Sequence, residues 1–213
     1  MDKKLKEQDR PKTEHDGVDY IDFSQIDAGK EGDYTELRKF YGEDTDKAYK
    51  YFRNNDEAQG AISFYTSDGY TDIRTYLSNK AEYGNKLENG TTCYGYSADA
   101  VQKYIDDLSE YITNNKIDRD VVLSRRINVV SNEETSKFFG NLKVGDVYQD
   151  KSFTSSSLLE LYGFGEFNIK IFAKKGSNAA CSVNNNEFEY VIEKGSKFKV
   201  IETKNNNITV ELL

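Results

Sequence analysis

The sequence predicts an α+β domain in which helices precede strands. Residues 33–115 place Leu, Ile, Tyr and Phe at spacings of three and four, the period of an amphipathic helix. From about residue 120, short apolar or alternating runs separated by Gly and Asn indicate strands. The 213 residues include 13% aromatic residues, which is enough for one well-packed domain and too many for a disordered chain. Helices followed by strands are the α+β arrangement.

The helical half, about residues 33–115, divides into amphipathic segments. Breaks are expected at Gly42, Gly69 and Asn89-Gly90, because glycine and Asn-Gly interrupt helices. Residues 1–18 are polar, and we expect them to form a flexible tail ahead of a single domain that spans residues 19–213. The segments are DYTELRKFYG, TDKAYKYFRN, DEAQGAISFYTSD, GYTDIRTYLSNK and ADAVQKYIDDLSEYITNN.

The β-rich half, about residues 120–213, begins with DVVLSRRINVV, an apolar run that contains two arginines. KVGDVYQDKSFTSSSL and the strand-like EFNIKIFAKK follow, and NNNITVELL supplies a last strand after an asparagine turn. Between them, FEYVIEKGSKFKVIE predicts a hairpin that turns at Lys194-Gly195-Ser196. The sequence shows no linker that would divide the chain into two domains.

Composition excludes several functional classes. The net charge is -8 and the sequence pI is about 4.9, whereas nucleic acids and anionic membranes favour clustered Lys and Arg. An acidic surface suits a basic or guanidinium-bearing protein target, although it is also common among soluble proteins. The single histidine, His15, leaves almost no material for an imidazole-based triad or a zinc site, so we expect no metal. No apolar run is long enough to span a membrane.

The two cysteines and the N-terminus give weaker information about disulfide pairing and export. Cys93 and Cys181 are expected to be inert, and a disulfide between them is the alternative. The opening MDKKLKEQDRPKTEHDG has charged residues but no apolar segment, so it does not match a signal peptide. If the protein is exported, a leader was removed before this numbering begins or delivery follows another route.

The pair Glu187 and Glu189 is the strongest indication of function in the sequence. The two acids flank Phe188 where an asparagine-rich loop enters a strongly alternating run. On an extended strand, side chains at i and i+2 point the same way, so both carboxylates should share one face with Phe188 on the other. Like charges on one face repel each other, which a purely structural strand would rarely include.

Two further elements precede this pair in the β-rich half. Arg125 and Arg126 end an apolar strand, and Ser155–Ser157 follow Phe153. Taken alone, a double arginine is usually a solvated edge and a serine run is usually a turn. The arginine pair, the serine run and the glutamate pair, in this order and all on strands, indicate function more specifically together than any one of them does alone.

This order resembles the arginine-serine-glutamate class of mono-ADP-ribosyltransferases. That exoenzyme family includes the actin-modifying components of clostridial binary toxins and the Rho-modifying clostridial exoenzymes, and the resemblance covers about residues 55–205. AISFYTSDGYTDIRTYLSNK also resembles a family helix with two tyrosines, here Tyr65 and Tyr70, followed by Ile73-Arg74. The resemblance implies an ADP-ribosyltransferase fold in which N-terminal helices pack on two small, mostly antiparallel sheets that enclose an NAD cleft.

The resemblance also implies roles for individual residues. Glu189 would bond the ribose 2′-hydroxyl and stabilise an oxocarbenium-like transition state, as acids do in glycoside hydrolysis. Ser155 would hold that carboxylate in place. Arg125 would contact the NAD phosphates or the backbone around them, and Arg126 would add a phosphate contact. NAD contacts are implied for the remaining motif positions Tyr65, Tyr70 and Arg74, although the tyrosines could equally be core residues.

Glu187 indicates the acceptor. In this family an acid two residues before the catalytic glutamate goes with arginine modification, and glutamine there goes with asparagine. A carboxylate can orient a guanidinium and take up its proton during attack. Three positions depart from the family pattern. Arg74 replaces the usual asparagine, Ser156 replaces the usual threonine, and residues 183–186 lack the aromatic side chain that often contacts the protein substrate.

The sequence therefore predicts transfer of ADP-ribose from NAD to an arginine of a host protein, such as actin or another cytosolic protein, with release of nicotinamide. The protein would be a toxin or effector that is secreted or delivered into a host cell, with a separate delivery component as one route, and would act in the cytosol. One alternative is an NAD glycohydrolase, with water as acceptor. Another is a non-catalytic interaction domain that retains the fold.

Overall fold

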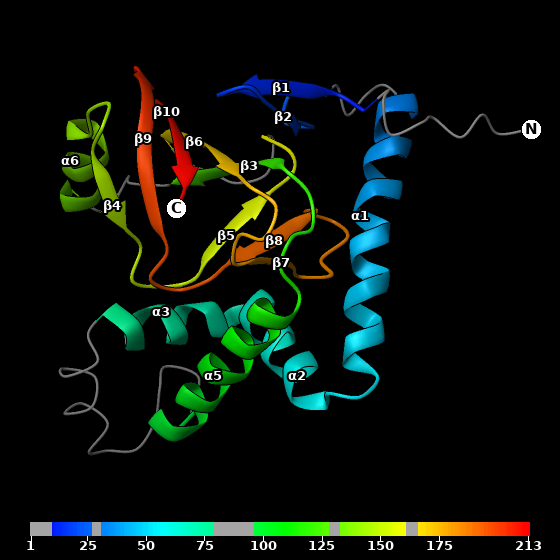
Figure 1. The fold of residues 1–213 in the computed structure, drawn as a ribbon. Coiled ribbons are helices and arrows are strands. Elements are labelled where there is room, and N and C mark those ends of the chain that lie inside the picture. The colour runs from blue at the N-terminus through cyan, green and yellow to red at the C-terminus, as the bar shows by residue number, and fades with distance from the viewer. Residues whose placement is uncertain (1–9, 27–30, 79–95, 128–132, 161–165) are drawn as a thin grey trace, which may run out of the picture.

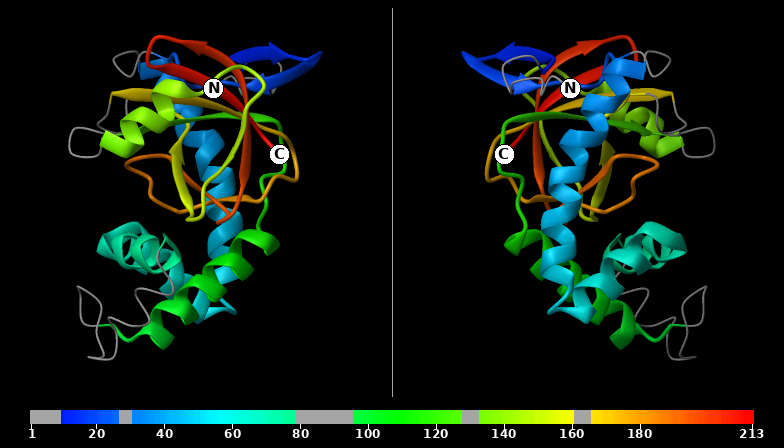
Figure 2. Two further views of the ribbon diagram at one scale, coloured as in Figure 1. Left: turned by 90° about the vertical axis from the view of Figure 1, so that its left-hand side faces the viewer. Right: turned by 90° about the vertical axis from the view of Figure 1, so that its right-hand side faces the viewer.

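A computed structural model describes residues 10–26, 31–78, 96–127, 133–160 and 166–213. A two-stranded hairpin (residues 12–21) precedes the helices, most helices then come before the remaining strands, and one helix (residues 133–141) lies between two of those strands (Figure 1). Helices and strands are therefore largely separate along the chain, which confirms the predicted α+β class. The helices of the first half pack below and beside the sheet, and α6 lies at the opposite side from α1 (Figure 2). The helices are α1 (Glu31–Phe52), α2 (Asp56–Phe64), the π-helical η2 (Tyr65–Gly69), α3 (Tyr70–Ser78), α5 (Ala98–Asn114) and α6 (Glu133–Asn141).

The break predicted at Gly42 is wrong, because Gly42 lies inside the single helix α1. One glycine inside a helix costs only about 1 kcal/mol relative to alanine. A continuous buried stripe on the same helix offsets that cost. The stripe consists of Leu37, Phe40, Tyr41, Ala48 and Phe52. Packing therefore overrides the local propensity, whereas the break predicted at Asn89-Gly90 lies outside the described residues.

The interruption predicted at Gly69 is confirmed in a modified form. Helices α2 and α3 are joined through η2, where Ser67 has the non-helical angles φ -96 and ψ -139. A Cβ atom at Gly69 would lie 2.5 Å from the backbone oxygen of Phe64, so only glycine fits at this kink. The kink matters for function because Tyr65, the first residue of η2, points toward the sheet.

The strands form one hydrogen-bonded sheet, whereas two small sheets were expected. Its order is β4-β9-β10-β6-β3-β5-β8-β7, and the β1–β2 hairpin joins it through β3. The two expected sheets meet where β3 pairs with β5 through the single register pair Ser124–Ser157. The strands are β1 (Lys12–His15), β2 (Val18–Ile21), β3 (Val121–Ile127), β4 (Val147–Gln149), β5 (Thr154–Ser157), β6 (Phe167–Ala173), β7 (Ala179–Cys181), β8 (Glu189–Ile192), β9 (Lys197–Lys204) and β10 (Asn207–Leu212).

The flexible tail predicted for residues 1–18 is wrong from Arg10 onward, and residues 1–9 lie outside the described part. Strand β1 pairs antiparallel with β2, which orders residues 12–21. The Arg10 side chain is buried, and its Nε lies 3.2 Å from Glu36 Oε1 on α1. The guanidinium also sits 5.1 Å from the ring centroid of Phe40. These contacts anchor the hairpin to α1, which sequence periodicity alone does not predict.

The hairpin predicted around Lys194-Gly195-Ser196 is also wrong. The chain does turn there, with Gly195 at φ 74, but β8 and β9 do not pair with each other. Strand β8 lies between β5 and β7, and β9 lies between β4 and β10, so neither has a free edge for the other. The turn instead carries the chain from one half of the sheet to the other.

Strand β8 separates two hydrophobic cores. Tyr190 and Ile192 belong to the core shared with α1, whereas Val191 belongs to the core shared with α2, α3 and α5. Alternation along the strand therefore places Glu189 on the face of Val191, toward the helical layer. None of the helices in the described part of the chain is long and apolar enough to cross a membrane.

Cys181 at the end of β7 is a buried free thiol, and burial raises its pKa to about 12. A thiol of that kind is a poor nucleophile, which agrees with the inert role expected for it. Cys93 lies outside the described residues.

Candidate active site

Glu189 is the centre of the candidate site. Glu189 is the first residue of strand β8 and is buried, with 6% of the residue exposed. Ser182 Oγ donates a hydrogen bond of 2.7 Å to Glu189 Oε2. Ser155 lies opposite Val191 on β5, so its side chain shares the face of Glu189, and its hydroxyl is near enough to lower the pKa of the Glu189 carboxyl group. The predicted pairing of Ser155 with Glu189 thus has a structural basis in the register of β5 and β8.

The environment of Glu189 raises the pKa of its carboxyl group. Burial is the largest cause, and the nearby Glu187 charge acts in the same direction. The hydroxyls of Ser182 and Ser155 oppose the rise because they donate to the charged form, and Arg125 opposes it through its positive charge. Among the described residues, no Lys, Arg or His forms an ion pair with Glu189. The carboxylate is therefore held by the Ser182 hydroxyl and has no counter-ion in the part of the chain that the structure describes.

Tyr65 extends this hydroxyl chain. Its hydroxyl and Ser155 Oγ lie 3.0 Å apart, which links η2 to β5. The ring is 4% exposed and packs edge-on against Phe153 at 5.7 Å between ring centroids. Burial raises the pKa of Tyr65 to about 12, so the hydroxyl stays protonated at neutral pH. Tyr65 is therefore a core residue whose polar end reaches the candidate site, and its contact with NAD stays a prediction.

Arg125 lies beside the same strand. Its Nη1 is 3.5 Å from the backbone oxygen of Ser155 and 4.0 Å from Asp150 Oδ2. Thr154 Oγ1 donates a hydrogen bond of 2.9 Å to that same Asp150 oxygen, which fixes the carboxylate between the two. Arg125 is thus positioned against the β5 backbone, one of the two roles that the sequence predicts for it.

Three predicted NAD contacts are not joined to this cluster. Arg126, one residue along β3 from Arg125, is exposed on the opposite face, as strand alternation requires. Tyr70 is 52% exposed, and Arg74 is exposed on α3. In the described part of the chain, no hydrogen bond or ion pair connects any of them to Glu189 or Ser155. Their NAD contacts stay predictions.

The structure corrects the expected geometry of Glu187. Strand β8 begins only at Glu189, and Phe188 has a left-handed backbone with φ 49, so the i, i+2 rule does not apply. Phe188 is 2% exposed and packs edge-on against Tyr34 and Tyr41. Burial of this ring forces the turn and leaves Glu187 exposed. One acid is therefore buried and the other open to solvent.

Sequence reasoning missed two residues that hold Glu189. Ser182 is one, and Tyr41 on α1 is the other, because its hydroxyl donates a hydrogen bond of 2.9 Å to the Glu189 backbone oxygen. Ser182 closes the otherwise apolar run Ala-Ala-Cys-Ser, and a single hydroxyl at the end of a buried strand is a weak signal in sequence. The other motif serines have different partners, since Ser156 donates to Tyr190 O and Ser157 to Glu187 O.

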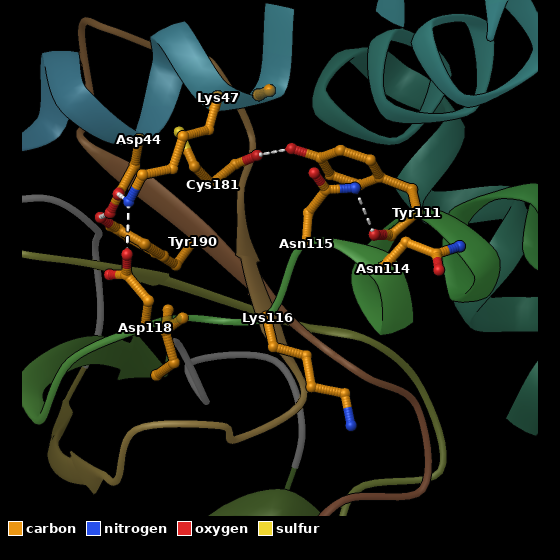
Figure 3. Close-up of a pocket in the computed structure, with 11 residues that line it drawn as sticks. Asp44, Lys47, Tyr111, Asn114, Asn115, Lys116, Asp118, Cys181 and Tyr190 are labelled. Carbon is orange, nitrogen blue, oxygen red and sulfur yellow. Dashed lines mark hydrogen bonds and ion pairs between the residues drawn. The ribbon is translucent and has the colours of Figure 1, made fainter. Parts of the chain in front are cut away.

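A cavity of about 160 Å³ is lined by residues of α1, of the C-terminal end of α5 and the segment after it, and of β7 and β8 (Figure 3). Its polar groups are largely satisfied by one another. Lys47 Nζ lies 3.1 Å from Asp44 and 2.6 Å from Asp118, and the Tyr111 hydroxyl donates to the backbone oxygen of Cys181 at 2.6 Å. None of Glu189, Ser155 or Arg125 lines it, so this cavity is not the candidate active site.

Within the described residues, one group of side chains has the spacing of potential metal ligands: His15, Asp16 and Glu211. It lies on the β1–β2 hairpin and β10, not on the strands that carry Glu189. His15 Nε2 is 2.8 Å from Glu211 Oε1, so an ion pair or hydrogen bond accounts for the proximity.

Comparison with solved structures supports the fold assignment. BECa, an ADP-ribosylating toxin of a binary enterotoxin of C. perfringens solved with NADH, has a TM-score of 0.71 at 18% identity over 92% of this chain. The chain spans only 50% of BECa. C3stau2 from S. aureus, solved with NAD, has a TM-score of 0.64 at 16% identity, with 91% of this chain and 98% of that chain covered. The C3 exoenzyme of Clostridium limosum gives 0.64 at 17% identity, over 91% and 97%.

A search of curated protein sequences finds no match. In contrast, the model of the ADP-ribosyltransferase exoenzyme family matches residues 39–212, which include the whole cluster around Glu189. The fold and the matched span agree with the resemblance carried by Arg125, Ser155 and Glu189. The chain therefore belongs to the ADP-ribosyltransferase exoenzyme family.

Proposed function

We propose that this protein transfers ADP-ribose from NAD to an arginine side chain of a protein and releases nicotinamide. The observation that carries the proposal is the Glu189 carboxylate, which is buried, hydrogen-bonded by Ser182 and without a counter-ion among the described residues. Membership of the exoenzyme family supports the transferase chemistry, and two of the structural neighbours were solved with NAD or NADH.

The proposed reaction breaks the bond between the nicotinamide nitrogen and the ribose C1′ atom. The bonding electrons leave with nicotinamide, so positive charge develops on the ribose. A buried carboxylate in a site of low polarity stabilises such a charge strongly, because water does not screen the interaction. Glu189 performs this role, and Ser155 and Ser182 keep its carboxylate oriented. Arg125 keeps the β5 backbone in place through Ser155 and offers a guanidinium beside the site.

Glu187 completes the proposal on the acceptor side. An arginine nitrogen attacks the ribose C1′ atom and must lose a proton as the new C–N bond forms. The exposed Glu187 carboxylate can orient the guanidinium and accept that proton. Its position is fixed through its own backbone, because Ser157 Oγ donates a hydrogen bond of 2.6 Å to the Glu187 carbonyl oxygen.

Arg126, Tyr70 and Arg74 are proposed to bind NAD from the exposed sides of β3 and α3. All three are at the surface, where a phosphate or an adenine ring can reach them. The physiological acceptor is proposed to be a host protein such as actin or another cytosolic protein, reached after secretion or through a separate delivery component. BECa belongs to a binary enterotoxin, and this chain corresponds to about half of its length.

The test is incubation with labelled NAD and a host-cell lysate, with wild type, Glu187→Gln and Glu189→Gln compared. Transfer predicts a labelled protein band with wild type and none with either variant. Glu187→Gln should retain much of the NAD hydrolysis, whereas Glu189→Gln should lose it. Glu202→Gln, an exposed glutamate on β9, is the matched control and should behave as wild type.

The alternatives give different results in the same experiment. NAD hydrolysis without any labelled band would identify a glycohydrolase with water as acceptor. No turnover of NAD by a folded wild-type protein would indicate a non-catalytic domain and contradict the proposal. Digestion of the labelled band and mass spectrometry then identify the modified side chain, and an acceptor other than arginine would contradict the role given to Glu187.

A further inference from the structure

We infer that Ser182 is a positioning residue of this reaction, whose hydroxyl holds the Glu189 carboxylate oriented and ionised from the base of the loop that carries Glu187. The inference deepens the proposed function and rests on it. It assigns a role outside the arginine, serine and glutamate motifs, to a residue whose importance the sequence does not indicate.

The position of Ser182 follows from strand pairing. Cys181 pairs with Tyr190 in the antiparallel β7–β8 ladder, so the next residue, Ser182, lies beside Glu189. The Ser182 backbone N–H donates a hydrogen bond of 2.9 Å to the Glu189 backbone oxygen. Its Oγ donates the second hydrogen bond, of 2.7 Å, to the carboxylate. Ser182 thus fixes both the backbone and the side chain of Glu189.

Glu189 is consequently held from both neighbouring strands. Ser155 lies on the same face from β5 on one side of β8, and Ser182 hydrogen-bonds the carboxylate from the end of β7 on the other. Ser182 is 1% exposed, so water does not replace its hydroxyl. A serine hydroxyl has one proton to donate, and this one is committed to Glu189.

The same hydroxyl connects the carboxylate to the loop. The backbone N–H of Asn184 donates a hydrogen bond of 3.3 Å to Ser182 Oγ. Both ends of this loop have left-handed backbone angles, with φ 59 at Val183 and φ 49 at Phe188. Such angles are rare for a β-branched or bulky residue and persist only where packing holds them. Ser182 is thus the direct link between a strained loop that presents Glu187 and the acid that performs the cleavage.

The chemical consequence is a dependence on pH. A hydroxyl that donates to the Glu189 carboxylate favours the ionised form, and so does the positive charge of Arg125, whereas burial and the nearby Glu187 favour the protonated form. Loss of the Ser182 hydroxyl should therefore keep Glu189 protonated to higher pH. Since cleavage needs the ionised acid, the variant should lose activity first on the acid side of its pH profile.

The experiment measures kcat/KM for NAD hydrolysis against pH for wild type, Ser182→Ala and Ser182→Cys. Ser156→Ala is the matched control, because Ser156 is also buried beside β8 but donates to the Tyr190 backbone oxygen. Ser182→Ala should lower kcat/KM about tenfold or more at the acid edge, and the acid limb should move to higher pH. Ser182→Cys should shift it less, because a thiol is a weaker donor of similar size. Ser156→Ala should leave the limb in place.

A second readout does not depend on turnover. In ¹³C-carboxyl NMR titrations, the Glu189 resonance, assigned with Glu189→Gln, should titrate at higher pH in both Ser182 variants than in wild type. If Ser182→Ala fails to fold, Ser182→Cys carries both measurements. An acid limb and a titration that both stay at their wild-type positions would overturn the role of Ser182. Absence of turnover in wild type would instead contradict the proposed function, and the titration would still test Ser182.

Discussion

Two carboxylates in this protein are equally buried, but the pKa of one is lowered and the pKa of the other is raised. Asp22, just after β2, and Glu189, at the start of β8, are each 6% exposed. Hydroxyl groups donate to both: Thr13 and Ser24 donate hydrogen bonds to Asp22, and Ser182 donates one to Glu189. Asp22 also has a cation, because Lys170 Nζ lies 2.7 Å from its Oδ2. The described residues provide no such partner for Glu189.

This difference sets the direction of each pKa. Burial raises the pKa of both groups, but at Asp22 the hydrogen bonds from Lys170, Ser24 and Thr13 outweigh it, so the pKa is lowered. At Glu189 the hydroxyls do not outweigh burial, and the pKa is raised. A carboxylate that is paired with a lysine stabilises the fold. A carboxylate without a counter-ion is instead available to stabilise a cation that develops on a substrate. The predictions below separate these two roles.

The largest expected effect is on catalysis. Glu189→Gln should reduce NAD cleavage by about 10³-fold, because the amide keeps the shape of the side chain but lacks the charge that faces the ribose. Single-turnover measurement of nicotinamide release checks this. Asp22→Asn provides the contrast and should leave the rate per folded molecule close to wild type. Equal rate losses in the two variants would mean that the two acids do not differ in role.

The next effect is on stability. Asp22→Asn should lower the free energy of unfolding by about 3 kcal/mol, because the Lys170 ammonium loses its buried partner. Urea unfolding at pH 7 measures this. The pKa of Asp22 is lowered, so its stabilisation is complete above the ordinary value of 3.8 and is lost as the pH falls through the value in the folded protein. Asp19→Asn, in an exposed pair with Lys12 at 3.6 Å, should cost less than about 0.5 kcal/mol.

A smaller effect has the opposite sign. Glu189→Gln should raise the free energy of unfolding by about 1 kcal/mol at pH 7 to 8, which corresponds to a Tm increase of about 2–4 °C. The pKa of Glu189 is raised, so the cost of its charge is absent below the ordinary value of 4.5 and grows as the pH rises toward the value in the folded protein. Calorimetry at pH 4 should therefore show the same Tm for Glu189→Gln as for wild type. A variant that is less stable than wild type at neutral pH would contradict this prediction.

The smallest effect concerns the hydroxyl chain. Tyr65→Phe removes the partner 3.0 Å from Ser155 Oγ and should lower kcat for NAD hydrolysis by about threefold to tenfold, with the ring still packed on Phe153. Tyr49→Phe, an exposed tyrosine on α1, should have no effect. A loss with Tyr49→Phe as large as that with Tyr65→Phe would remove the case for the hydroxyl chain.

The sequence predicts the order of elements well because helix and strand periodicities are local. The sequence also predicts correctly that Arg125, Ser155 and Glu189 lie on strands, where the direction of each side chain follows from alternation along the chain. Local rules fail where tertiary packing decides. The ring of Phe188 is buried between aromatic residues of α1, so strand β8 starts only at Glu189. Glu187 is therefore exposed whereas Glu189 is buried.

Long-range pairing accounts for the other differences. Ser182 becomes a partner of Glu189 only through the β7–β8 register, and no spacing in the sequence encodes that contact. The expected hairpin after β8 fails because both strands already have neighbours on each side. Arg10 is buried against Glu36, a residue far along the chain, so its polar segment resembles a tail in the sequence.

The central claim is that the fold pairs Asp22 with the Lys170 ammonium, whereas the residues that the structure describes give Glu189 no counter-ion. A ¹³C-carboxyl NMR titration of the wild-type protein tests both groups in one sample, with assignments from Asp22→Asn and Glu189→Gln. The structure predicts that Asp22 titrates below its ordinary value of 3.8 and Glu189 above its ordinary value of 4.5. If Glu189 titrates at or below 4.5, its carboxylate is already stabilised as fully as a structural acid, and the account of its catalytic role is contradicted.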